Sequence, residues 1–179
     1  MDIEKKVWEI LLSEEDIRRR TKELGQQLSE EYANKKLVVV SLLKGSFIFT
    51  ADLVRQLSIP VKIEFMTTSS YGHGEESSGI INIINDIKKD LTGYDVLVVD
   101  DITDSGLTMK FVMEHLSKKN AASVKCCVLL DKPERRKVDI VPDYLGFTIP
   151  DKFVVGYGLN YGDYYRNVPY VFVVTDKDR

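Results

Sequence analysis

The chain has 179 residues, with 25 Lys and Arg against 28 Asp and Glu, so its formal net charge at pH 7 is −3. Hydrophobic residues make up 44 % of the chain, which excludes collagen-like, low-complexity and wholly disordered proteins. The slightly negative balance excludes bulk electrostatic attraction to nucleic acid or anionic lipid. For this length, a single domain over 1–179 is the expected organisation.

The sequence contains neither a membrane-span pattern nor an export pattern. No apolar run approaches the roughly 18 residues of a membrane span, and positions 1–6 lack the apolar stretch of a signal peptide. The two cysteines, Cys126 and Cys127, are adjacent and could form a bridge only with severe strain. We therefore expect two buried thiols in a reduced compartment, hence a cytoplasmic protein with no membrane and no nucleic-acid partner.

Helical and strand patterns alternate along the chain. Ser13 is the expected N-cap of the first helix, because the acidic residues at 14–16 favour the positive end of a helix. The later elements are expected, in chain order, as a strand over Leu37–Leu43, a helix from Phe47 to Leu57, a strand over Val61–Met66, a loop over 67–79, strands over Ile80–Ile84 and Val96–Val99, a helix over Leu107–Leu116, a strand over Val124–Leu130, a connector rich in Lys, Pro and Arg, and short strands over Phe153–Gly156 and Val171–Val174.

This alternation predicts an α/β fold with a mainly parallel twisted sheet flanked by helices. In such sheets, ligands bind beyond the carboxyl ends of the strands. The loop over 67–79 is long enough to suggest a functional role. The segments that follow the strands are therefore the candidates for a site.

The strongest pattern lies at 96–108, where an apolar strand leads to Asp100, Asp101 and Asp104 and then to a helix. Free backbone N–H groups at a helix start bind anions, and Gly106 lets the backbone approach a phosphate closely. The simpler alternative is a capped helix after a strand. That alternative does not explain Asp100 and Asp101 at the end of a buried strand, where unpaired charge is costly. The functional interpretation is favoured.

This segment resembles the phosphoribosyl diphosphate binding motif of the type I phosphoribosyltransferases. Further matches to the hypoxanthine-guanine members of that family are collinear between residues 37 and 174. They lie at Leu42–Gly45, Ser69–Gly72, Leu130–Pro133, Pro150–Leu159 and Tyr165–Tyr170. The resemblance implies the type I phosphoribosyltransferase fold, with a small hood formed by terminal segments.

The resemblance also implies a reaction. The 5-phosphoribosyl group would pass from phosphoribosyl diphosphate to hypoxanthine or guanine, giving IMP or GMP and diphosphate. In this arrangement Asp100 and Asp101 hold the ribose hydroxyls and Mg²⁺, the implied cofactor. Asp104 is the general base toward the purine N7. The 5′-phosphate is held by the loop of Asp104, Ser105, Gly106, Leu107 and Thr108.

By the same resemblance, Lys44, Gly45 and Arg166 contact the diphosphate, and a non-proline cis peptide often precedes the lysine. The implied purine pocket contains Ile102, Lys132, Phe153, Val154 and Asn160.

Within that pocket, Lys132 would donate to the 6-oxo group and would face other donors if adenine were bound. Phe153 would stack on the base, and the Val154 backbone would read its edge. Asn160 stands where the family usually has Asp, so we expect weaker binding of a second Mg²⁺.

A mobile active-site loop over 67–79 is implied as well, with a lid at Ser69, Ser70, Tyr71 and Gly72. The family further implies a homodimer or homotetramer.

Other interpretations stay open. The basic cluster Arg135–Lys137 is expected to be a solvated turn outside the site. Two alternative functions are a phosphoribosyltransferase that prefers xanthine and an RNA-binding regulator that reuses the fold. RNA binding needs a basic face with stacking residues, and the scattered Lys and Arg argue against it.

Overall fold

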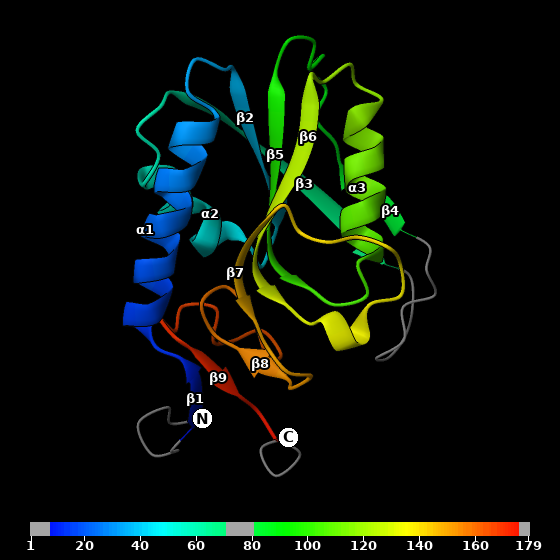
Figure 1. Ribbon diagram of the computed structural model, residues 1–179. Helices are drawn as coiled ribbons and strands as arrows, with labels where there is room; N and C mark the ends of the chain where they lie inside the picture. Colours follow the sequence, from blue (N-terminus) through cyan, green and yellow to red (C-terminus); the bar gives the residue numbers. More distant parts are fainter. Residues whose placement is uncertain (1–7, 71–80, 176–179) are drawn as a thin grey trace.

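The computed structural model describes residues 8–70 and 81–175 (Figure 1). The elements are, in chain order, β1 (Glu9–Leu12), α1 (Glu14–Glu31), β2 (Leu37–Leu43), α2 (Phe47–Arg55), β3 (Val61–Ser70), β4 (Ile81–Asn85), β5 (Asp95–Thr103), α3 (Leu107–Ser117), β6 (Ser123–Asp131), the 3₁₀ helix η2 (Pro133–Arg135), β7 (Tyr144–Thr148), β8 (Val154–Val155) and β9 (Val171–Val173).

Six of these strands form one sheet in the order β4-β3-β2-β5-β6-β7. Within this sheet, each pairing along the series β3-β2-β5-β6-β7 is parallel. The edge strand β4 runs antiparallel to its neighbour β3. Helices α1 and α2 cover one face of this sheet and α3 covers the other (Figure 1). The predicted α/β fold with a mainly parallel sheet is confirmed.

The central strands are apolar throughout because both of their faces are covered. In β2, Val39 packs into the core under α1 and α2, whereas Val38 packs into the core under α3. In β5, Val99 and Val98 divide between the two cores in the same way. A strand buried on both faces reads as a continuous apolar run rather than an alternating one.

Helix α1 begins as its sequence predicts. The Ser13 hydroxyl oxygen accepts a hydrogen bond from the Asp16 backbone N–H at 3.1 Å, which satisfies one free donor of the first turn. Ile17 and Leu24 are among the side chains buried on the inner face of the helix.

A second, three-stranded antiparallel sheet has the order β1-β9-β8 and joins the two ends of the described chain (Figure 1). Trp8 packs on Phe172 of β9, with ring centroids 4.6 Å apart. The hood that the family resemblance implies is expected in these terminal segments. Its role stays a prediction. Strand β1 is not predicted, since it has four residues and none of them is fully buried.

Two predicted segments differ from the structure. The loop predicted over 67–79 is wrong for 67–70, because β3 continues to Ser70 and pairs with β4. Threonine favours the extended backbone, and an antiparallel strand pair tolerates polar side chains on one face. The predicted connector after β6 contains η2 and β7. Residues 71–80, including Ile80 of the predicted strand, lie outside the described residues.

Helices in the described part of the chain are too short or too polar to cross a membrane.

Candidate active site

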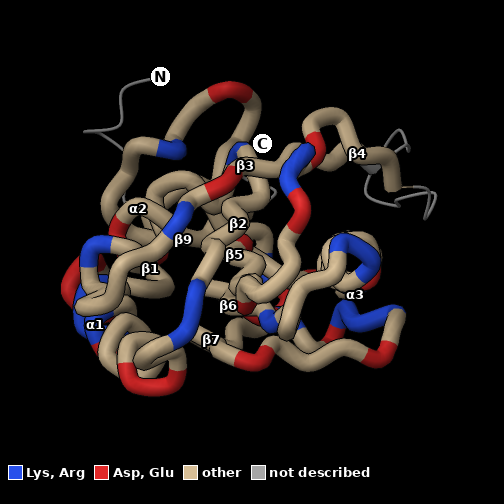
Figure 2. Tube along the Cα trace, turned by 90° about the horizontal axis from the view of Figure 1, so that it is seen from above, with Lys and Arg blue, Asp and Glu red and all other residues tan. Residues whose placement is uncertain are grey.

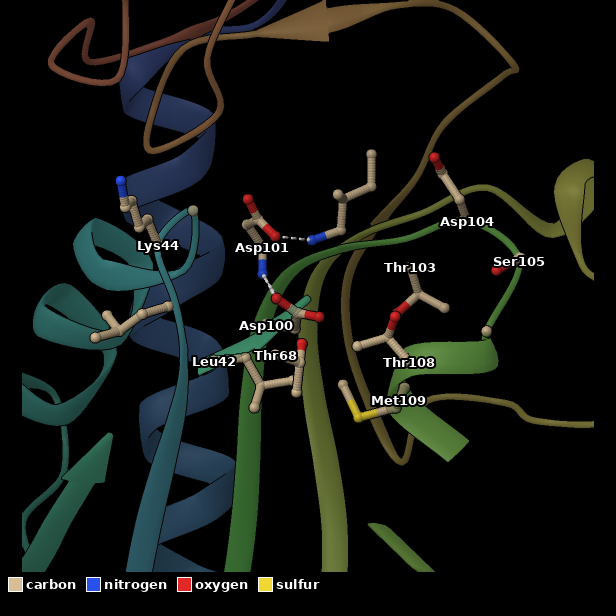
Figure 3. A pocket seen from close by; sticks show the side chains of 14 residues that line it. Leu42, Lys44, Thr68, Asp100, Asp101, Thr103, Asp104, Ser105, Thr108 and Met109 are labelled. Atoms are coloured by element: carbon tan, nitrogen blue, oxygen red, sulfur yellow. Dashed lines mark hydrogen bonds between the residues drawn. The ribbon is translucent and has the colours of Figure 1, made fainter. Parts of the chain in front are cut away.

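The loops that follow β2 and β5 lie side by side, because these strands are parallel neighbours. Between them is a cavity of 280 Å³ (Figure 3). It lies beyond the carboxyl ends of the strands, where open α/β sheets bind ligands. Its lining consists of Leu42, Leu43, Lys44, Gly45, Thr68, the run 100–106, Thr108 and Met109.

Asp100 and Asp101 face this cavity from the last part of β5, rather than from the loop after it (Figure 3). The Asp101 backbone N–H donates to a carboxylate oxygen of Asp100 at 3.0 Å. In the same way, the Ile102 N–H donates to Asp101 at 2.9 Å. These bonds hold both carboxylates against the end of the strand.

The carboxylate pair fits a hard cation. Burial and the neighbouring Asp101 charge raise the pKa of Asp100 well above its usual range, and burial also raises the pKa of Asp101. Within residues 8–70 and 81–175, no third His, Cys, Asp or Glu joins them in a metal-binding cluster. Such a pair suits Mg²⁺, which takes one or two carboxylates and completes its shell with water and substrate oxygens.

The loop between β5 and α3 has the geometry of an anion site. Gly106 caps α3 with a left-handed backbone, φ +80°, and has no side chain to cap the helix, while the Ser105 hydroxyl accepts the Leu107 N–H at 3.4 Å. The N–H groups that follow Leu107 in the first turn of α3 are available to an anion. Ser105 and Thr108 bring hydroxyls to the same cavity. Of the predicted phosphate-loop residues, only Leu107 does not line the cavity.

The diphosphate residues predicted from two distant segments, Lys44–Gly45 and Arg166, lie close together. The Leu43–Lys44 peptide bond is cis. A Cβ atom at Gly45 would lie 1.7 Å from a carboxylate oxygen of Asp101, and one at Gly158 would lie 2.0 Å from the Gly45 carbonyl oxygen. Arg166 donates to the Gly158 carbonyl at 2.6 Å, and its charge opposes part of the rise that burial causes in the pKa of Asp101.

Lys132 is buried at the end of β6 and lies between two carboxylates. Its Nζ is 3.7 Å from Asp104 Oδ1 and 3.9 Å from Asp151 Oδ1. Asp151 is not among the site residues that the sequence predicts. The predicted purine lysine and the predicted general base are therefore neighbours.

The remaining purine residues differ in their surroundings. Ile102 lines the cavity, whereas Lys132, Phe153, Val154 and Asn160 lie outside its lining. Phe153 is 40 % exposed and meets Tyr161 edge-on, with ring centroids 5.9 Å apart. Val154 is buried in β8. The exposed Asn160 donates its side-chain amide to the Gly162 carbonyl at 2.5 Å.

The predicted lid falls partly in β3. Ser69 and Ser70 are the last residues of that strand, whereas Tyr71 and Gly72 lie outside the described residues. Thr68, which comes just before them, lines the cavity and was not predicted.

The basic cluster at 135–137 is not simply a solvated turn, as the sequence predicted. Arg136 forms an ion pair with Asp131, and the two side chains are only 15 % and 10 % exposed. Arg135 lies 3.3 Å from Asp151. The prediction is wrong for Arg136 because the segment folds back onto the loop at Ser105, whose carbonyl accepts the Lys137 N–H at 2.9 Å.

Comparisons with known proteins agree with this geometry. Residues 7–162 match the family model for the phosphoribosyl transferase domain. A hypoxanthine-guanine phosphoribosyltransferase of Aquifex aeolicus is 52 % identical over 98 % of this chain and 99 % of its own length. A hypoxanthine phosphoribosyltransferase of Salmonella typhimurium is 46 % identical over 91 % of this chain and 93 % of its own.

Among solved structures, a hypoxanthine phosphoribosyltransferase from Staphylococcus aureus superimposes with a TM-score of 0.91. It is 42 % identical, and the match covers 99 % of each chain. From the family match, the near full-length relatives and the shared fold, the chain belongs to the phosphoribosyltransferase family, in its hypoxanthine-guanine group.

Proposed function

We propose that the chain transfers the 5-phosphoribosyl group of phosphoribosyl diphosphate to hypoxanthine or guanine, giving IMP or GMP and diphosphate. One observation carries this proposal beyond the family match. A single cavity joins the Asp100–Asp101 carboxylate pair, the left-handed phosphate loop at Gly106 and the Lys44–Gly45 turn. Each of these suits a different part of the donor.

The donor would lie along the cavity from the phosphate loop toward β2. The 5′-phosphate accepts hydrogen bonds from the start of α3 and from Ser105 and Thr108. Asp100 and Asp101 accept hydrogen bonds from the ribose hydroxyls. Lys44 and Arg166 place positive charge near the diphosphate, and the absence of a side chain at Gly45 lets its backbone come close.

Mg²⁺ would be held by Asp100 and Asp101 together with substrate oxygens, and it would neutralise charge on the departing diphosphate. The proposed roles of the chain's own residues are to orient the ribose and to keep the diphosphate in line with the purine nitrogen. Closure of the proposed lid at Ser69–Gly72 would exclude water from the oxocarbenium-like ribose.

On the purine side, Asp104 is the proposed general base at N7, and Lys132 the proposed donor to the 6-oxo group. Their 3.7 Å separation supports both assignments, because N7 and O6 are neighbours on one edge of a purine. Phe153 would stack on the base, the Val154 backbone would read its far edge, and Ile102 would pack against it. Asn160 would approach the same edge through its amide.

We also propose that the protein works in the cytoplasm as a homodimer or homotetramer. Both cysteines are buried free thiols, which supports a reducing compartment. Lys and Arg are interspersed with Asp and Glu along the described trace (Figure 2), which favours a small-molecule enzyme over an RNA-binding regulator.

The test is a direct assay. Purified protein is incubated with phosphoribosyl diphosphate, Mg²⁺ and hypoxanthine, guanine, xanthine or adenine, and nucleotide and diphosphate are measured. Formation of IMP and GMP is expected, together with loss of activity in excess chelator and in Asp101→Asn. Turnover of xanthine well above that of the other bases, or full activity in chelator, contradicts the proposal.

A further inference from the structure

The phosphate loop is supported from outside by the segment 132–140, which belongs to the connection between β6 and β7. A Cβ atom at Gly106 would lie 2.5 Å from Cγ2 of Ile140, 3.0 Å from Cδ of Arg136 and 3.2 Å from Cγ2 of Val138. The Lys137 backbone N–H donates to the Ser105 carbonyl at 2.9 Å. The loop therefore cannot move outward unless this segment moves as well.

The segment is anchored to the sheet by the ion pair of Arg136 with Asp131. Asp131 is the last residue of β6, and its carbonyl accepts the Ile149 N–H at 2.9 Å. Because the two side chains are 15 % and 10 % exposed, loss of either partner leaves a largely buried charge without compensation. Arg136 thus connects a rigid strand end to the outer side of the phosphate loop.

Stability alone does not account for this arginine. Its Nη1 atom is buried and has no hydrogen-bond partner among the described residues. Buried donors are normally paired, and a buried ion pair is weak evidence for a stabilising role. The presence of Arg136, buried with an unused donor beside the phosphate loop, is better explained by its effect on the position of that loop.

We infer that Arg136 is a positioning residue, which holds the loop 104–108 in the conformation that binds the 5′-phosphate of the donor. The inference rests on the proposed function of that loop. Lys132 has its own anchor, since its backbone N–H donates to the Thr103 carbonyl at 3.0 Å. The purine side of the site should therefore depend much less on Arg136 than the phosphate side does.

The test compares Arg136→Met with Lys137→Met. Both substitutions remove one positive charge from the same segment, but Lys137 is exposed and its backbone bond to Ser105 survives the change. KM for phosphoribosyl diphosphate is measured at saturating hypoxanthine, and KM for hypoxanthine at saturating donor. Thermal unfolding and hydrogen–deuterium exchange of the segment 132–140 are followed in parallel.

For Arg136→Met, KM for phosphoribosyl diphosphate should rise about 10- to 100-fold, because small misplacements of a binding group have effects of this size. KM for hypoxanthine should stay within about twofold, and Lys137→Met should leave both values within about twofold. Exchange in the segment should be faster only in Arg136→Met. A merely structural role would lower the melting temperature and the active fraction without moving either KM.

If Arg136→Met does not fold, Asp131→Asn replaces it, since it removes the negative charge that faces the arginine with almost no change of volume. An unchanged KM for phosphoribosyl diphosphate in a folded variant of either kind overturns the inference. A wild-type protein that forms no nucleotide contradicts the proposed function instead. An active wild type beside a variant with unchanged KM contradicts only the role of Arg136.

Discussion

The Nζ of Lys132 lies 3.7 Å from a carboxylate oxygen of Asp104, although the two residues follow different strands. Lys132 comes after β6 and Asp104 after β5, and these strands are parallel neighbours. The pairing brings a buried cation and a carboxylate to the same end of the sheet. In the proposed function, the group that selects the base, Lys132, is therefore next to the group that accepts the proton, Asp104.

The first prediction concerns the choice of base. Hypoxanthine should exceed adenine in kcat/KM by at least about tenfold, because the Lys132 ammonium would face the 6-amino donors of adenine and leave buried donors unpaired. In Lys132→Met, hypoxanthine should lose efficiency more than adenine, so the ratio should narrow. The exposed Lys137→Met is the control. Equal kcat/KM for both bases in the wild type would mean that Lys132 does not read the 6-position.

The second prediction concerns Asp104. Its change to Asn removes a proton acceptor with little change in shape, so kcat should fall about 10²- to 10⁴-fold with a modest change in KM. Asp151→Asn is the matched control, because Asp151 lies at a similar distance, 3.9 Å, from Lys132. Its loss of kcat should be much smaller. If Asp104→Asn keeps nearly full kcat, Asp104 is not the general base and only contributes to the start of the helix.

The third prediction concerns Asn160, at a position where the family resemblance implies an Asp. An amide has no charge and is a weaker Mg²⁺ partner than a carboxylate. Asn160→Asp should therefore lower the Mg²⁺ concentration at half-maximal rate, while kcat need not rise, because diphosphate release can slow.

The measurement is a Mg²⁺ titration at saturating purine. Asn167→Asp adds the same charge in the same part of the chain but lines a different cavity. Asn167→Asp should leave the Mg²⁺ concentration at half-maximal rate as it is in the wild type. Superimposable curves for Asn160→Asp and the wild type would mean that this position has no metal role here.

The fourth prediction separates backbone strain from steric fit in the phosphate loop. Gly106 and Gly93 have nearly the same left-handed backbone, with φ +80° and +75°. An alanine at either position costs roughly 1–2 kcal/mol of conformational strain. Only at Gly106 would the new methyl group also meet a side chain, 2.5 Å away at Ile140.

Gly106→Ala should therefore raise KM for phosphoribosyl diphosphate by at least about tenfold. Gly93→Ala should lower only the melting temperature. The two variants are compared by steady-state kinetics and thermal unfolding. Equal effects on KM would show that contact with the segment 132–140 does not restrict the loop.

The fifth prediction concerns the thiols. Burial raises the pKa of Cys126 to about 12, and burial also raises that of Cys127. A raised pKa keeps a thiol protonated at pH 8, and the thiolate is the form that reacts. In the folded protein, neither thiol should react with a thiol reagent such as dithionitrobenzoate. In guanidinium, both thiols should react. Rapid reaction of the folded protein would contradict this placement.

Much of the fold follows from local sequence. The apolar runs of β2 and β5 predict strands buried on both faces, and the Ser13 cap predicts the start of α1. Local sequence does not predict strands β1 and β7, because each is short and only partly buried. Their extended conformation depends on a neighbouring strand, β9 or β6, rather than on a pattern of their own.

The same division holds for the site. The segment 100–108 is contiguous in the chain, so its carboxylates, its glycine and the helix start could all be read from the sequence by itself. Contacts between distant segments were decided only by the tertiary structure. Gly158 lies against the Gly45 carbonyl, and Asp151 lies beside Lys132. Arg136 is the clearest case: its charge and the polar segment around it predict exposure, but the chain folds back and pairs it with Asp131 at the end of β6. Composition predicts whether a lysine or arginine prefers water, whereas its burial depends on whether the fold places a carboxylate within reach.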